Sequence, residues 1–162
     1  MNSSAASDVY KRQELNEKKL IKDLFETMYH HNGIGLAAVQ VGIHKRIIVL
    51  DVSKKDDEKN PLCFINPVIK KISQKTSIYE EGCLSIPNTF IEIERPKICT
   101  ISYVDQEGAK REMDCDGLLA TCIQHEINHL DGKLIIDYLS KIKKDLIIKK
   151  LSKQKTSNRV VV

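Results

Sequence analysis

Residues 117 to 132 combine the spacing of an amphipathic helix with the side chains of a metal site, and this segment constrains the fold more than any other. Apolar residues follow the helical repeat at Leu119, Ile123, Ile127 and Leu130. Asp114 or Asp116 is placed to cap the start of this helix, and Gly132 to end it. Residues 124 to 132 read Gln-His-Glu-Ile-Asn-His-Leu-Asp-Gly, so His125 and His129 are four residues apart on one helix face, about 6 Å along the axis. Two imidazoles at that spacing can bind one metal ion.

Glu126 lies about 100° round the helix from His125, where it can reach a water on the metal without being a ligand. The alternative is a surface helix with accidental histidines. Two imidazoles and a carboxylate without partners would be costly inside an apolar stripe, so the pattern favours the metal site.

A catalytic site of this kind needs a third protein ligand and an open position for water. The chain has no His and no Glu after His129, and Asp137 is eight residues on, about 12 Å away if the helix continued. Gly132 matches the longer protease pattern His-Glu-x-x-His-x-x-Gly-x-x-His, but Ile135 stands at its final histidine position. We therefore expect the third ligand upstream, while a zinc peptidase with another third ligand remains an alternative.

Two upstream segments are weak signals when taken alone. Residues 80 to 87 read Glu-Glu-Gly-Cys-Leu-Ser-Ile-Pro, and Cys83 there could complete a Cys-His-His set. Residues 33 to 40 read Gly-Ile-Gly-Leu-Ala-Ala-Val-Gln, in which the glycines allow a close backbone approach to a ligand and Gln40 offers an amide donor. A lone cysteine is more often a small core residue, and a Gly-x-Gly turn is common.

In this order and spacing, the three segments resemble the signature motifs of the peptide deformylase family, Gly-x-Gly-Leu-Ala-Ala-x-Gln, Glu-Gly-Cys-Leu-Ser and His-Glu-x-x-His. The resemblance covers roughly residues 14 to 152. It implies one divalent metal ion held by Cys83, His125 and His129, natively Fe(II) in many members, with zinc, nickel or cobalt as substitutes. One thiolate and two imidazoles suit any of these ions. Asn128 stands where many members have Asp, and we expect little effect because it faces away from the ligand pair.

The family's reaction removes the formyl group from the N-terminal formyl-methionine of newly made polypeptides and releases formate. By this resemblance, water activated by the metal attacks the formyl carbon, and Glu126 passes the water proton to the departing amine. The Gln40 amide and the Leu84 backbone N–H stabilise the oxyanion. The peptide binds as an added strand along Gly33, Ile34 and Gly35. A methionine pocket is lined by Ile34, Leu118, Cys122 and His125, and Glu81 with Arg95 forms either an ion pair or a substrate contact.

The rest of the chain predicts a single α+β domain, with antiparallel or mixed sheets around the His-Glu-x-x-His helix. Helical spacing predicts an N-terminal helix over residues 14 to 31 and a C-terminal helix over roughly 138 to 152. Strands are predicted over residues 46–52, 63–72, 89–95, 97–104 and 109–113, with a hairpin turn at 105–108. Residues 1 to 13 fit neither period, and we expect them to be disordered or a cloning or assembly scar.

Charge and composition bear on location and partners. Five cysteines without a spacing framework, no apolar run of roughly 18 to 20 residues and no secretory signal favour a cytoplasmic protein, with neither a membrane nor a DNA partner. Residues 141 to 162 hold eight basic side chains against Asp145, ending in a basic tail over 153–162. Such a tail is a solvated helix face or a site that attracts RNA. A ribosome-associating module is therefore the second alternative, or an added property of a deformylase.

Overall fold

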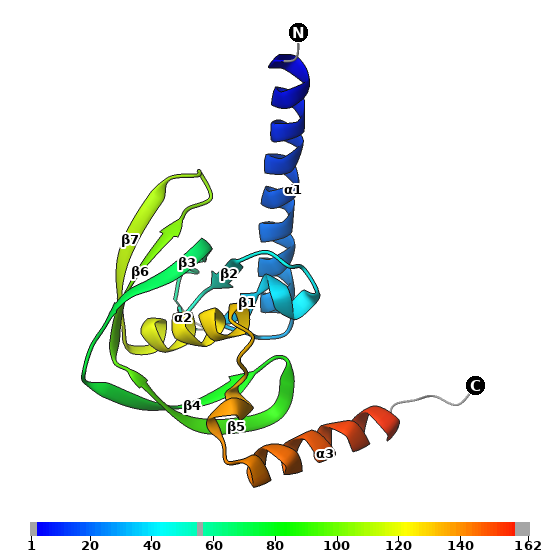
Figure 1. Ribbon diagram of the computed structural model, residues 1–162, viewed down its shortest axis with the longest axis vertical. Coiled ribbons are helices and arrows are strands. Elements are labelled where there is room, and N and C mark those ends of the chain that lie inside the picture. Colours follow the sequence, from blue (N-terminus) through cyan, green and yellow to red (C-terminus); the bar gives the residue numbers. More distant parts are fainter. Residues whose placement is uncertain (1–2, 55–56, 158–162) are drawn as a thin grey trace.

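A computed structural model describes residues 3–54 and 57–157 of the chain (Figure 1). Within them the elements run in the order α1 (Ser3–His30), β1 (Gly35–Ala37), η1 (Ala38–Val41), β2 (Ile47–Leu50), β3 (Leu62–Ile72), β4 (Thr76–Cys83), β5 (Ile86–Pro96), β6 (Ile98–Val104), β7 (Lys110–Asp116), α2 (Gly117–Leu130), η2 (Ile135–Tyr138) and α3 (Lys141–Ser157). The α+β class and single domain predicted from the sequence are confirmed.

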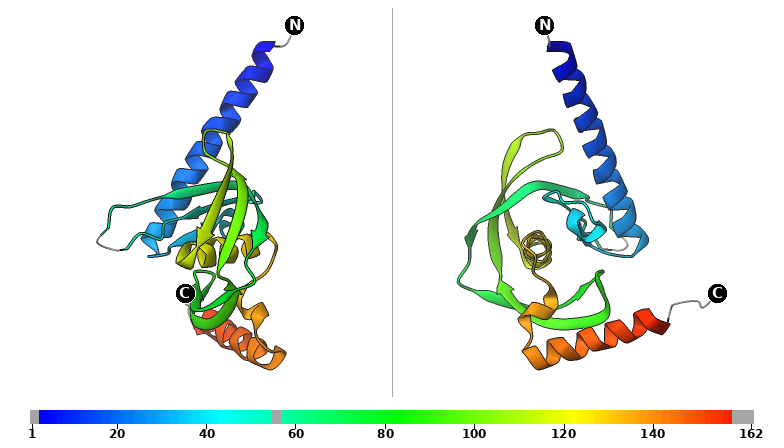
Figure 2. Two further views of the ribbon diagram at one scale, coloured as in Figure 1. Left: turned by 90° about the vertical axis from the view of Figure 1, so that its left-hand side faces the viewer. Right: turned by 45° about the vertical axis from the view of Figure 1, so that its right-hand side comes forward.

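The strands form two antiparallel sheets that surround α2. One sheet has the order β1-β2-β3-β6-β7, and the second is the β4–β5 pair. Figure 2 shows α2 end-on, with strands curving round it and α1 outside the first sheet. The helix that carries the histidines is thus the centre of the molecule, as its apolar stripe required.

Strand β2 is buried on both faces because its four residues are all apolar. Ile48 and Leu50 pack toward α2, in a cluster that includes Ile123. Ile47 and Val49 point the other way, into a second cluster with the α1 residues Ile21, Leu24 and Met28. A continuous apolar run therefore joins α1 to the central helix through one strand.

A third cluster fixes the C-terminal elements to the second sheet. Ile91 and Ile93 of β5 pack with Ile135 and Ile136 of η2, and Ile147 of α3 contacts the same cluster. Ile91 and Ile93 lie on the same face of β4–β5 as Glu81 and Arg95, so η2 and α3 cover part of the inner face, whereas Ile78 and Phe90 leave the outer face exposed.

Several boundaries differ from those predicted. Helix α1 begins at Ser3, so it continues through residues where we expected no regular structure. Helix α3 spans 141–157 instead of 138–152, and it includes the first five residues of the predicted tail, whereas residues 158–162 lie outside the described part of the chain. Asp116 precedes α2 in the capping position, but its side chain makes no capping hydrogen bond.

Two strands were missed. Strand β1 has only three residues, too few for an alternating pattern. Strand β4 was not among the predicted strands, and it directs the charged side chain of Glu81 inward, against the usual polar-out rule. The pairing of β4 with β5 has a register shift between Gly82 and Cys83.

Candidate metal centre

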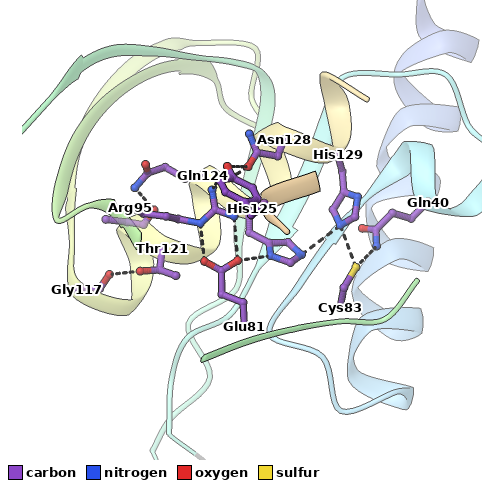
Figure 3. Close-up of polar contacts among 12 residues, drawn as sticks. Gln40, Glu81, Cys83, Arg95, Gly117, Thr121, Gln124, His125, Asn128 and His129 are labelled. Atoms are coloured by element: carbon purple, nitrogen blue, oxygen red, sulfur yellow. Dashed lines mark hydrogen bonds and ion pairs between the residues drawn. The ribbon is translucent and has the colours of Figure 1, made fainter. Parts of the chain in front are cut away.

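Three side chains that could hold a metal ion, Cys83, His125 and His129, meet between the end of β4 and the C-terminal half of α2 (Figure 3). Cys83 Sγ lies 3.2 Å from His129 Nε2, which lies 3.2 Å from His125 Nε2. The ligand atoms of all three residues are within 4.8 Å of one another. One sulfur and two nitrogens at these separations can be shared by a single divalent transition ion.

The Cys83 thiol is prepared for ligation by its neighbours. Burial is the largest influence and raises its pKa, but hydrogen bonds with His125 and His129 outweigh burial and lower the pKa to about 6. The thiolate, which is the ligating form, is therefore favoured at neutral pH. All five cysteines lie in the described part of the chain, and none of them forms a disulfide there.

His125 is oriented from behind by Glu81. The Glu81 Oε2 atom is 2.8 Å from His125 Nδ1, so the proton sits on Nδ1 and Nε2 is left for a metal. Arg95 in turn donates to Glu81 through Nε at 2.5 Å and through Nη2 at 2.9 Å. Burial raises the pKa of Glu81, but its bonds with His125 and Arg95 prevail and hold the pKa below its usual range. Glu81 and Arg95 were expected to form either an ion pair or a substrate contact, and in the structure they form a buried ion pair.

Glu126 is enclosed on the same helix, with one oxygen unsatisfied. Among the described residues, its Oε2 is one of two buried side-chain oxygens without a hydrogen-bond partner. Its Oε1 lies against Gly35 of β1, where an added Cβ would be only 2.5 Å away. Burial is the main cause that raises the pKa of Glu126 to about 7. A carboxylate poised near neutrality can both accept and return a proton.

Gln40 points its amide nitrogen toward the thiolate. Its Oε1 accepts a hydrogen bond from the Ala37 N–H at 2.8 Å, which directs Nε2 to Ser85 Oγ at 2.9 Å and to Cys83 Sγ at 3.9 Å. Leu84 lies in the turn between β4 and β5, directly after Cys83. Ser85 was not singled out from the sequence, although it belongs to the motif that contains Cys83.

A cavity of about 600 Å³ opens beside these groups. The residues predicted for catalysis or substrate binding that line it are Gly33, Ile34, Gly35, Gln40, Leu84, Leu118, Cys122, His125 and Glu126. Burial raises the pKa of the Cys122 thiol to about 12, so it presents a neutral, apolar surface.

Tyr79, Phe90 and Thr121 also line the cavity and were missed, because their strand and helix positions carry no motif. Strand β1 is the end strand of its sheet, so the segment 33–35 adjoins the cavity at a sheet edge.

Comparisons with known proteins identify the family. A sequence model described as polypeptide deformylase matches residues 3–145. The chain is a member of the peptide deformylase family. The peptide deformylase of Pelagibacter ubique (strain HTCC1062) is 59% identical over 146 residues, covering 90% of this chain and 84% of the relative. That of Rhizobium meliloti (strain 1021) is 54% identical over 136 residues, covering 84% and 78%.

Solved structures of peptide deformylases have the same fold. The crystal structure of the Ehrlichia chaffeensis enzyme is 44% identical with a TM-score of 0.82, over 88% of this chain and 84% of that one. A crystal structure of the Ehrlichia enzyme in complex with actinonin is 45% identical with a TM-score of 0.79, over 88% and 83%.

Membership of the peptide deformylase family establishes the activity. The protein is a metal-dependent hydrolase that removes the N-formyl group from newly made polypeptides. The alternatives of a zinc peptidase and of a non-catalytic basic module are not favoured. Within the described residues, no helix has both the length and the apolar character needed to cross a bilayer.

Proposed function

We propose that this deformylase holds its metal ion with Cys83, His125 and His129, and that Glu126 moves the protons of the reaction. The observation that carries the proposal is the buried Glu126 carboxylate, which has a free oxygen and adjoins the only Cys-His-His group among the described residues. A buried carboxylate without a partner costs stability, so its position needs a functional reason.

The bound ion supplies Lewis acidity, which activates a water for attack on the formyl carbon. Glu126 then accepts the proton from that water at Oε2, because this oxygen has no competing hydrogen bond in the described structure. It returns the proton to the amine nitrogen as the formyl C–N bond breaks. The products are formate and a peptide with a free amino group.

The groups around the cavity orient the substrate. Gln40 Nε2, directed by the bond between Oε1 and Ala37, and the Leu84 N–H donate to the formyl oxygen as negative charge develops on it. The peptide backbone extends the sheet along residues 33–35, since β1 has a partner strand on one side only. The methionine side chain enters the pocket beside Leu118 and Cys122.

Formate release from formyl-Met-Ala-Ser, measured anaerobically with Fe(II), tests these roles. We expect activity in the native chain and near-complete loss in Glu126→Ala, with one metal retained in both. Cys83→Ala should lose metal and activity together. Full metal retention in Cys83→Ala would remove Cys83 from the ligand set, and cleavage of internal peptide bonds without formate would favour a peptidase.

Fe(II) is the ion we propose for the cell, with zinc, nickel and cobalt as substitutes, because a donor set of one thiolate and two imidazoles accepts each of them. Metal analysis of protein purified anaerobically without added metal decides this. Iron at one equivalent supports the proposal, and zinc at one equivalent overturns it.

We also propose that the enzyme acts in the cytoplasm and that its basic C-terminal segment attracts the ribosome. Lys149 and Lys150 of α3 are exposed, and Lys153 begins the basic tail, so this end of the chain presents positive charge to solvent. Co-sedimentation with ribosomes at low salt, before and after removal of residues 153–162, tests the association. Equal binding by both forms would exclude a role for the tail.

A further inference from the structure

A closed triangle of hydrogen bonds lies behind the metal centre, outside the set of residues proposed to act on substrate. Arg95 Nη1 donates to Asn128 Oδ1 at 2.8 Å and to Tyr138 Oη at 3.1 Å, and the Tyr138 hydroxyl donates to Asn128 Oδ1 at 2.8 Å. The three residues come from β5, α2 and η2. The side chain of Asn128, for which we expected little effect, is thus engaged in this network.

The triangle continues to the metal ligand through Arg95. Nη1 of the guanidinium is used by the triangle, whereas Nε and Nη2 bind the two oxygens of Glu81. The far oxygen of that pair, Oε2, accepts from His125 Nδ1. Because the guanidinium is planar and 4% exposed, its orientation is fixed at one end by Asn128 and Tyr138 and at the other by Glu81.

We infer that Tyr138 and Asn128 are positioning residues for the metal ligand His125, acting through Arg95 and Glu81. This inference rests on the proposed function, in which His125 is a ligand. Loss of a group that orients a ligand directly typically lowers metal affinity 10- to 100-fold. Tyr138 and Asn128 act one bond further out, so we expect zinc to dissociate about three- to tenfold faster without their polar groups.

Tyr138→Phe isolates the hydroxyl. The ring centroid of Tyr138 lies 5.1 Å from the Arg95 guanidinium carbon, and phenylalanine keeps this cation–π contact. The side chain is 47% exposed, so its replacement leaves no cavity in the core. Asn128→Leu removes the acceptor at similar volume, and Asn128→Asp restores one. Tyr103→Phe is the matched control, because that ring packs against Phe64, at 4.7 Å between centroids, and lies on β6, which contributes no residue to the triangle.

The test is the rate at which zinc-loaded protein transfers its metal to a colour-forming chelator. Tyr138→Phe and Asn128→Leu should release zinc faster, whereas Asn128→Asp and Tyr103→Phe should match the native chain. The absorption bands of the cobalt-substituted protein should shift in the first two only, since they report the ligand field. A merely structural role predicts a lower thermal midpoint with native release rates and unchanged cobalt bands, and this result would overturn the inference.

A double-mutant cycle checks the route. In a Glu81→Gln background, or Glu81→Asp if the first does not fold, Tyr138→Phe should have little further effect on zinc release. An undiminished effect would show that Tyr138 acts by another path and would refute the inference. Failure of the proposed metal centre is recognised separately, because the native chain itself would then not hold one zinc per molecule.

Discussion

Replacing Gly35 with alanine inserts a methyl group between strand β1 and the Glu126 carboxylate, the proposed proton carrier. The new Cβ would lie 2.5 Å from Glu126 Oε1, 3.0 Å from Glu126 Cδ and 2.7 Å from Leu50 Cδ2. Ordinary van der Waals contact begins at 3.4 Å, so Oε1 must retreat by about 0.9 Å. Leu50 is fully buried and has little room to yield, so the displacement falls mainly on Glu126.

A displacement near 1 Å of a reacting group can reduce the rate about 100-fold, which corresponds to about 2.7 kcal/mol of activation free energy. We therefore expect kcat for formate release to fall about 100-fold in Gly35→Ala. Overpacking should also reduce the free energy of unfolding by about 1–3 kcal/mol. Metal content should stay at one ion per chain, because the three atoms nearest to the new methyl group belong to Glu126 and Leu50 and not to the proposed ligands.

Gly33→Ala provides the comparison. Its Cβ would lie 2.8 Å from Leu84 Cδ1, but Leu84 is 39% exposed and its methyl group can rotate toward solvent. The loss of kcat should therefore be much smaller than in Gly35→Ala. The reasoning is refuted if Gly35→Ala keeps kcat within about threefold of native, or if it loses metal, since the ligands and not the base would then have moved.

Three further perturbations address the ion pair, the α1 anchor and the metal. Glu81→Gln leaves the Arg95 charge buried without its partner. Urea denaturation of the metal-free protein should therefore show that the free energy of unfolding falls by about 3–5 kcal/mol. A decrease below about 1 kcal/mol would contradict this reasoning. Burial raises the pKa of Asp51, but hydrogen bonds from Ser53, from Tyr29 and from backbone N–H groups outweigh burial and lower the pKa. The ionised Asp51 therefore stabilises the folded protein above pH about 4, and this stabilisation disappears as the pH falls through the lowered pKa. Thermal midpoints of Asp51→Asn should accordingly lie below native at pH 7 and converge with it at low pH; a constant gap would exclude ionisation as the cause. Removing the metal with a chelator should lower the thermal midpoint, reversibly on adding zinc, and no change would show that metal binding is not coupled to folding.

The sequence predicted those parts of the fold and site that depend on spacing within one element. His125, Glu126 and His129 lie on a single helix, so their relative directions follow from helical geometry alone. The β-branched runs that became β2, β3 and β6 are likewise apolar enough to be recognised locally. In each case the information is contained in the segment itself.

Strand β4 was missed because the residues that stabilise its inward-facing side chain lie in other segments of the chain. The inward position of Glu81 breaks the alternation expected of a half-buried strand. This carboxylate is tolerated because Arg95 and His125, 14 and 44 residues away, satisfy it. Neither partner is adjacent to Glu81 in the chain. The local sequence pattern therefore indicates a polar segment and not a half-buried strand.

Gly35 illustrates the same limit at the active site. The Gly-x-Gly segment was interpreted as room for a ligand backbone, yet what most closely faces the missing Cβ of Gly35 is the Glu126 carboxylate, 91 residues further along the chain. The requirement for glycine is steric, because Gly35 is not among the residues with positive φ. A buried carboxylate with one free oxygen needs a neighbouring residue that leaves it space and whose side chain offers no hydrogen bond. Gly35, in the edge strand β1, meets both conditions because it has no side chain. Gly35 therefore limits the position of the Glu126 carboxylate, the proposed base, so its substitution is expected to affect kcat more than metal binding.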